Sequence, residues 1–137
     1  MPAGYSGTRL VDKLGIKQGY VVALLNAPEG YDVLLGTLPV GVSVVRGLKG
    51  ELDLIQFFAT EEATLRRAFP GLKASMKEGG VICVSWPKRS SEMQSDLGDE
   101  AARACGLKNG LVDVKVCTVD DTWSALKFVR RSKDRGG

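Results

Sequence analysis

Two short segments of the sequence carry side chains that could bind a ligand. NAPEG, at 26–30, follows the apolar run YVVALL, and many nucleotide-binding proteins place a glycine-rich phosphate loop at such a strand-to-helix turn. WPKRSS, at 86–91, ends another apolar run and offers an indole ring, two cations and two hydroxyl groups. At the carboxyl end of a strand, this second loop is suited to contact an anion or a phosphate. The alternative is an exposed polar loop without a ligand.

The absence of histidine and the placement of the cysteines exclude several kinds of chemistry. Without histidine there can be no Ser-His-Asp or Cys-His site. Cys83, Cys105 and Cys117 lie far apart in the sequence, without the spacing of a zinc site, so we expect no metal. Cys83 falls inside an apolar run and is expected to pack there. Cys117 is expected near a strand end, where a reactive thiol would require a nearby cation.

The charge of the chain is mild and unevenly distributed. The 137 residues carry a net charge of +3, from 19 basic and 16 acidic residues, which is too little to indicate nucleic-acid binding by itself. Five basic residues and one acid lie within 127–137, and we expect 132–137 to form a flexible basic tail. No apolar run is long enough to span a membrane, so we expect one cytoplasmic domain over 1–137, without membrane contact.

Alternating helix and strand patterns predict the architecture. Apolar runs predict strands at 20–25, 42–45, 52–58, 81–86, 111–119 and 125–131. Helical periodicity predicts helices at 8–14, 28–35, 60–78 and 96–105, the third with a kink or break at Pro70. Such alternation implies an α/β, Rossmann-like three-layer sandwich of about six strands. The sheet is expected to be mostly parallel in the order 2-1-3-4-6-5, with an antiparallel hairpin at the carboxyl terminus.

Two stretches of the chain resemble class I S-adenosylmethionine methyltransferases. They are KLGIKQGYVVALLNAPEG and LKASMKEGGVICVSW, and the terminal hairpin is similar too, although one βα unit is missing. As a whole, the chain resembles a small bacterial family described only as a domain of unknown function. That resemblance rests on AGYSGTRLVDKLGIKQG, WPKRSSEMQSDL and GLVDVKVCTVDDTWSALKFVRR.

The residues that bind the methyl donor in that family are replaced here. Aligned on Gly19 and Gly30, the position of the family's first acidic residue holds Leu24. The first two glycine positions of the family's Gly-x-Gly-x-Gly loop hold an asparagine and Pro28, which has no N–H and cannot adopt left-handed angles. Arg46 stands where the family has the acid that binds ribose. We therefore expect no bound cofactor and no enzyme activity.

Three functions remain open. The favoured one is a non-catalytic binding or interaction module on a degenerate methyltransferase-like fold, with a protein partner or a second copy of the chain. The second is a small enzyme or ligand-binding protein with an altered pocket at the strand carboxyl ends, lined by Asn26, Glu29, Gly30, Arg46, Trp86, Lys88 and Arg89. The third is weak nucleic-acid binding through Lys88, Arg89 and the basic tail, which is not favoured because few aromatic residues accompany these bases.

Overall fold

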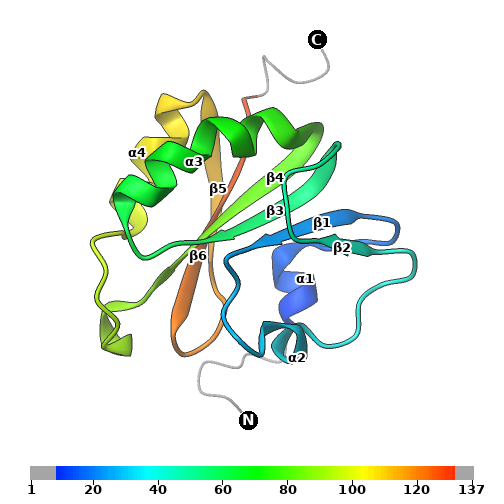
Figure 1. Ribbon diagram of the computed structural model, residues 1–137, viewed down its shortest axis with the longest axis horizontal. Coiled ribbons are helices and arrows are strands. Elements are labelled where there is room, and N and C mark those ends of the chain that lie inside the picture. Colours follow the sequence, from blue (N-terminus) through cyan, green and yellow to red (C-terminus); the bar gives the residue numbers. More distant parts are fainter. Residues whose placement is uncertain (1–8, 132–137) are drawn as a thin grey trace.

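The computed structural model describes residues 9–131 and contains one six-stranded sheet between helices (Figure 1). The segment 132–137, expected to be a flexible tail, lies outside the described residues. The strands are β1 (Val21–Leu25), β2 (Ser43–Val45), β3 (Leu52–Phe58), β4 (Met76–Pro87), β5 (Leu111–Thr118) and β6 (Trp123–Arg130). The helices are α1 (Leu10–Leu14), α2 (Tyr31–Leu35), α3 (Glu62–Ser75) and α4 (Asp99–Lys108), with a 3₁₀ turn at Arg89–Ser91.

The sheet has the strand order that the sequence predicts, β2-β1-β3-β4-β6-β5. Strands β1 to β4 run parallel, and β6 is antiparallel to both β4 and β5. The Rossmann-like α/β prediction is thereby confirmed. Because β1, β3 and β4 are parallel, their carboxyl ends meet at one edge of the sheet, where folds of this class bind ligands.

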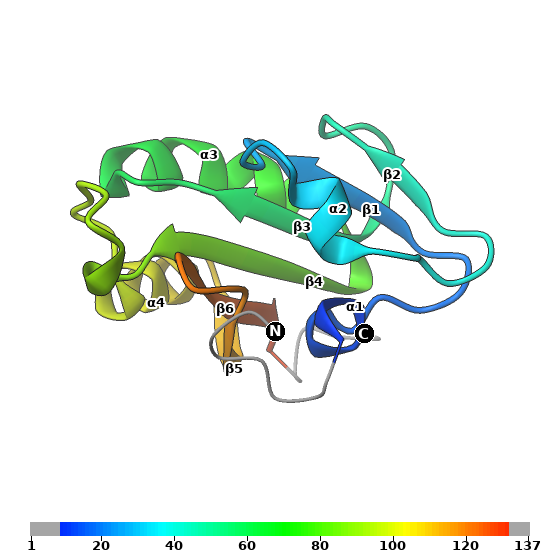
Figure 2. The ribbon, with the colours of Figure 1, turned by 90° about the horizontal axis from the view of Figure 1, so that it is seen from below.

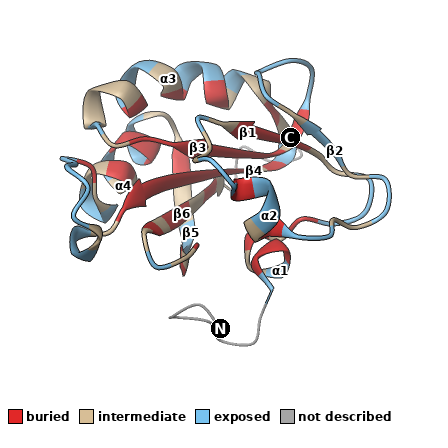
Figure 3. Ribbon diagram, turned by 60° about the horizontal axis from the view of Figure 1, so that its bottom comes forward, coloured by how far each residue is buried: buried red, intermediate tan, exposed pale blue. Residues whose placement is uncertain are grey.

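Two hydrophobic cores lie on opposite faces of the sheet. Helices α3 and α4 cover one core, which includes Ile55 and Phe69, and α1 and α2 cover the other, which includes Leu54 and Leu14. Figure 2 shows α1 below the sheet and α3 above it. Leu54 and Ile55 are neighbours in β3 and enter different cores, because successive side chains of a strand point to opposite faces. The buried central strands stand out against the exposed loops in Figure 3.

The path from α3 to β4 differs from the prediction in where the helix ends. The helix continues through Pro70 to Ser75 without a break. It does not extend to the glycine pair at 79–80, because Met76 is already extended and pairs with Leu52 as the first residue of β4. Gly80 is needed for close packing, since a Cβ there would lie 2.9 Å from the Leu52 carbonyl oxygen. Helix and strand therefore follow each other without a connecting loop.

Helix α4 also extends past its predicted end. Gly106 was expected to stop the helix, yet the helix continues to Lys108. Instead, Gly106 lets α4 approach β6, because a Cβ at this position would lie 2.1 Å from Cε1 of Phe128. Phe128 in turn meets Phe69 of α3 edge to face, with ring centroids 5.7 Å apart. Among residues 9–131, no helix is long and apolar enough to cross a membrane.

Candidate functional site

The loop after β1 keeps the backbone shape of a tight turn without its glycines. Asn26 has a φ of 59° and Gly30 a φ of 82°, both in the left-handed region that favours glycine. The asparagine therefore takes a backbone conformation that a glycine would otherwise supply. The helix that follows, α2, has only five residues, and Glu29 lies exposed just before it. These features provide little attraction for a phosphate group.

Aromatic side chains fill the space beneath this loop. Tyr31 of α2, Phe58 of β3 and Trp123 of β6 are all buried and meet edge to face. The ring centroids of Tyr31 and Phe58 are 4.9 Å apart, and those of Phe58 and Trp123 are 5.1 Å apart. We call these three residues the aromatic ladder. The ladder belongs to the core that α1 and α2 cover, so this part of the crevice is packed protein.

A buried chain of hydrogen bonds fixes the ladder to the middle of the sheet. The Tyr31 hydroxyl donates to Oε1 of Gln56 at 2.6 Å, and Nε2 of Gln56 donates to Oγ of Ser85 at 3.3 Å. Gln56 and Ser85 are fully buried. Burial raises the pKa of Tyr31 far above its usual value, so the phenol stays neutral and can serve as the donor. The two buried polar side chains of β3 and β4 therefore have hydrogen-bond partners within the protein.

Arg46 follows the end of β2 and pairs with α2. Its Nη2 lies 3.0 Å and 3.1 Å from the two carboxylate oxygens of Asp32. Both side chains are more than half exposed, so the pair contributes little to stability. The guanidinium therefore stands where the methyltransferase resemblance would require an acid for ribose, and its nearest charge partner is the carboxylate of Asp32.

Among residues 9–131, two hollows lie at the carboxyl edge of the sheet. The smaller, of about 250 Å³, lies between the ends of β1 and β3 and is lined by Asn26, Phe58, Ala59, Thr60, Thr64 and Trp123. The larger, of about 460 Å³, lies at the end of β4. It is lined by Trp86, Pro87, Lys88, Arg89, Met93, Ser95, Asp96, Leu97, Gly98, Asp99, Val116 and Ser124. We call the larger one the β4 hollow.

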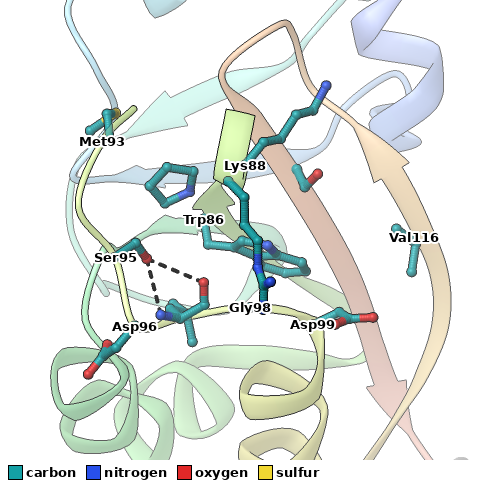
Figure 4. Close-up of a pocket in the computed structure, with 12 residues that line it drawn as sticks. Trp86, Lys88, Met93, Ser95, Asp96, Gly98, Asp99 and Val116 are labelled. Carbon is teal, nitrogen blue, oxygen red and sulfur yellow. Dashed lines mark hydrogen bonds between the residues drawn. The ribbon is translucent and has the colours of Figure 1, made fainter. Parts of the chain in front are cut away.

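The residues expected to form one pocket are divided between these places. Trp86, Lys88 and Arg89 line the β4 hollow, and Asn26 lines the smaller one. The remaining three, Glu29, Gly30 and Arg46, line neither hollow. Figure 4 shows Trp86, Ser95 and Gly98 around the β4 hollow, with the Lys88 side chain extending away from the start of α4.

Hydrogen bonds to the start of α3 and to the turn before β6 hold the loop that encloses the β4 hollow. The Lys88 N–H donates to the carbonyl of Thr122 at 2.7 Å. Further along the loop, the Ser95 hydroxyl donates to the carbonyl of Thr60 at 2.7 Å. Oδ1 of Asp96 accepts a hydrogen bond from the Glu62 N–H at 2.7 Å. The wall of the hollow is therefore fixed by long-range contacts.

Asp96 has a different role from the one expected. The sequence pattern places it at the start of the helix that follows it in the chain. In the structure that helix starts at Asp99, and Asp96 caps α3 from the neighbouring loop. Thr60, which precedes α3, accepts a hydrogen bond from the Asp96 N–H at its backbone carbonyl. A carboxylate is favourable near either helix start, so sequence alone does not distinguish the two positions.

The charged residues that line the β4 hollow are two cations, Lys88 and Arg89, and two acids, Asp96 and Asp99. Neither Lys88 nor Arg89 forms an ion pair with any residue between 9 and 131. Of the acids, Asp96 is engaged at the start of α3, and Asp99 lies 4.0 Å from Arg103. The indole of Trp86, only 6% exposed, adds an apolar wall. Among the described residues no group of three or more potential metal ligands is present.

The fold is that of S-adenosylmethionine-dependent methyltransferases. No family model and no curated protein matches the sequence. A solved methyltransferase from Aquifex aeolicus matches with a TM-score of 0.57 and 13% identity, over 88% of this chain and 87% of that one. Ribosomal protein L11 methylase from Lactobacillus delbrueckii matches with a TM-score of 0.57 and 13% identity, over 89% and 75%. Magnesium protoporphyrin IX methyltransferase from Synechocystis, solved with S-adenosylhomocysteine, matches with a TM-score of 0.54 and 10% identity, over 89% and 78%.

These matches correct one prediction. The missing glycines and the missing acid led us to expect no enzyme activity, and the matches to methyltransferases point instead to an enzyme. At 10–13% identity the likeness extends to the fold, and the side chains decide what is bound. The residues after β1 do not fit S-adenosylmethionine in the place that the family resemblance implies. The aromatic ladder leaves only a hollow of about 250 Å³ there, and Arg46 occupies the acid's position.

Proposed function

We propose that this chain is a small enzyme of methyltransferase-like fold that binds an anionic small molecule in the β4 hollow. The observation that carries the proposal is the pair of cations, Lys88 and Arg89, without ion-pair partners among the described residues, at the rim of an open hollow of about 460 Å³. The hollow lies at the carboxyl edge of the parallel strands, where α/β folds bind their ligands. Its volume is within the range typical of small-molecule sites.

The side chains assign a role to each wall of the hollow. Lys88 and Arg89 neutralise the ligand's negative group, and Arg89 can form two parallel hydrogen bonds to a carboxylate or a phosphate. Trp86 provides an apolar surface for the rest of the ligand. With no histidine in the chain, a proton acceptor for the reaction would come from Asp99, which lies at the exposed start of α4.

The first test is thermal unfolding with a panel of anionic ligands. The panel contains S-adenosylmethionine, S-adenosylhomocysteine, NADP, nucleoside phosphates and aromatic carboxylates. A ligand at 100 times its dissociation constant stabilises the fold by about 2.7 kcal/mol. For a domain of this size the midpoint then rises by on the order of 4–10 °C. A panel without any shift would contradict the proposal.

Matched variants then locate the binding site. Arg89→Ala is expected to abolish the ligand shift, because it removes the cation from the rim of the hollow. Arg67→Ala is the control, since Arg67 is also an exposed arginine and lies on α3 outside the hollow. Equal ligand shifts in both variants would place the ligand elsewhere. Chemical turnover of a ligand that binds only when Arg89 is present would show that the chain is an enzyme.

A further inference from the structure

The indole N–H of Trp86 is a hydrogen-bond donor without an acceptor among residues 9–131. The side chain is only 6% exposed, and its ring packs in the core that α3 and α4 cover. Every fully buried side-chain nitrogen and oxygen of the described residues has a partner, so this nitrogen lies on the small exposed edge of the ring. Because Trp86 lines the β4 hollow, its free N–H is directed into the hollow.

The start of α4 adds unused backbone donors to the same hollow. Gly98 and Asp99 line it, and no side chain caps this helix of ten residues. The first backbone hydrogen bond runs from the Ala102 N–H to the Gly98 carbonyl, so the N–H groups of 99–101 have no acceptor within the described part of the chain. These groups and the positive end of the helix dipole point toward the helix start. Figure 4 shows Trp86 beside Gly98 at this place.

The charged side chains of the hollow balance one another, so the unused hydrogen-bonding groups decide what it binds. Two cations, Lys88 and Arg89, are offset by two acids. One of these acids, Asp96, already accepts a hydrogen bond from the Glu62 N–H. The indole N–H, the first turn of α4 and the two cations are all donors. A complementary ligand therefore presents strong acceptors.

A single negative charge fits this balance better than two. A carboxylate accepts several hydrogen bonds and carries one charge, whereas a phosphate ester carries about 1.5–2 negative charges at neutral pH. The additional charge would lie near Asp99, whose carboxylate is paired only loosely, 4.0 Å from Arg103. Repulsion between like charges in a partly enclosed hollow therefore favours the carboxylate.

Exposed apolar side chains flank the hollow on two sides. Met93 is 43% exposed and Val116 is 54% exposed, and both line the hollow. Figure 4 shows Met93 on the loop and Val116 on β5, on opposite sides of Trp86. An apolar ligand body between them would remove their surface from water, which stabilises the complex.

We propose that the β4 hollow binds a small organic monocarboxylate, a proposal that rests on the ligand site proposed above and names the chemical class of its ligand. The carboxylate accepts hydrogen bonds from the Trp86 indole, from the start of α4 and from Arg89. The apolar body lies between Met93 and Val116. Trp86 is the residue that sets specificity, because a ligand without a strong acceptor leaves its N–H unpaired.

The two tryptophans of the chain make a direct test by heteronuclear NMR possible. Each gives one indole N–H signal, and the variants Trp86→Phe and Trp123→Phe assign the two signals. Titration of the intact chain with benzoate is expected to move the Trp86 signal. The Trp123 signal is expected to stay in place, because Trp123 lines the smaller hollow. A Trp86 signal that moves no more than that of Trp123 would overturn the proposal.

Probes that share one ring test the class of ligand. Benzoate, phenyl phosphate and benzamide present a carboxylate, a phosphate and an uncharged amide. Benzoate is expected to bind most tightly, and benzamide roughly tenfold more weakly, because a hydrogen bond to a charged acceptor is stronger. Tighter binding of phenyl phosphate would overturn the carboxylate assignment. Equal binding of benzamide and benzoate would overturn the role of the charge.

Trp86→Phe separates the donor from the packing of the ring. The variant keeps an aromatic ring and removes the N–H, so benzoate affinity is expected to fall roughly tenfold or more. Trp123→Phe is the control and is expected to leave this affinity unchanged. Should Trp86→Phe fail to fold, Trp123→Phe still identifies the remaining indole signal, and the titration of the unaltered chain decides.

The outcomes distinguish this proposal from the proposed function. If Arg89→Ala abolishes benzoate binding and Trp86→Phe does not weaken it, the donor role is overturned and the ligand site remains. Binding of other members of the thermal-unfolding panel without binding of benzoate would overturn the carboxylate class alone. An absence of binding by every member of that panel and by benzoate would overturn both proposals.

Discussion

The carboxyl ends of β1 and β4 lie on the same edge of one sheet and differ in what occupies the space beside them. Beside β1, the aromatic ladder and the Tyr31–Gln56 hydrogen bond pack buried side chains and leave a hollow of only about 250 Å³. Beside β4, a loop tied to α3 encloses a polar hollow of about 460 Å³. The comparison shows that one fold can restrict one binding position with core residues and keep a larger one open two strands away.

The largest expected effect comes from removing the middle of the ladder. Phe58→Ala deletes a fully buried ring that contacts both Tyr31 and Trp123, and it is expected to cost about 3–5 kcal/mol of unfolding free energy. Urea denaturation gives the value. Met93→Ala, at a 43% exposed position in the β4 hollow, serves as the control and is expected to cost less than about 0.5 kcal/mol. Similar costs for both variants would remove the distinction between the two regions.

The next effect concerns the hydroxyl that fixes the ladder. Tyr31→Phe leaves the ring in place and deprives the buried Gln56 of its donor, at an expected cost of about 1–3 kcal/mol. Tyr20→Phe is the matched control on a less buried tyrosine. Chemical denaturation of both variants under identical conditions measures the difference. If Tyr31→Phe is as stable as the control, the hydrogen-bond chain does not hold the crevice closed.

A smaller effect is expected at the wall of the β4 hollow. Asp96→Ala removes the cap of α3 and is expected to cost about 0.5–2 kcal/mol. The same change releases the loop, so binding of any ligand of the hollow should weaken as well. Asp121→Ala, at an exposed acid in the β5–β6 turn, is the control for charge. If Asp96→Ala lowers the free energy of unfolding but leaves ligand affinity unchanged, the loop does not need its contact with α3 to keep its shape.

The smallest effect is expected at the ion pair beside β2. Arg46→Ala removes a contact between two exposed side chains, and its cost is expected to be about 0.2–1 kcal/mol. In 1 M salt this cost should vanish, because the charges are screened over a few ångströms. Unfolding measured at low and high salt checks both statements. A large, salt-independent cost would mean that Arg46 has a packing role near the filled crevice.

The sequence was informative where the pattern is local. The mostly parallel sheet and its final hairpin followed from apolar runs of strand length, from helices between them and from a five-residue connection before the last strand. The left-handed angle of Asn26 agrees with its place in the glycine pattern. The sequence also indicated that this loop differs from a usual phosphate loop, since Pro28 cannot donate a backbone hydrogen bond.

What fills or lines each region depends on residues far apart in the chain. Trp123 meets Phe58 across 65 positions, and no local pattern indicates this contact. Asp96 caps a helix that begins 34 positions earlier. Val116 lines the β4 hollow because a β-bulge between Asp113 and Lys115 shifts the pairing of β5. Such contacts are decided by packing in three dimensions, which one sequence does not specify position by position.

Because α3 is followed directly by β4, the chain is not expected to tolerate inserted residues at this junction. Ser75 ends the helix and Met76 begins the strand, so a peptide inserted between them would have no loop to occupy and would push β4 out of register with β3. The exposed connection at 46–51 offers such a place, because most of its side chains face solvent. A tag or a protease site for studying this protein therefore belongs between β2 and β3.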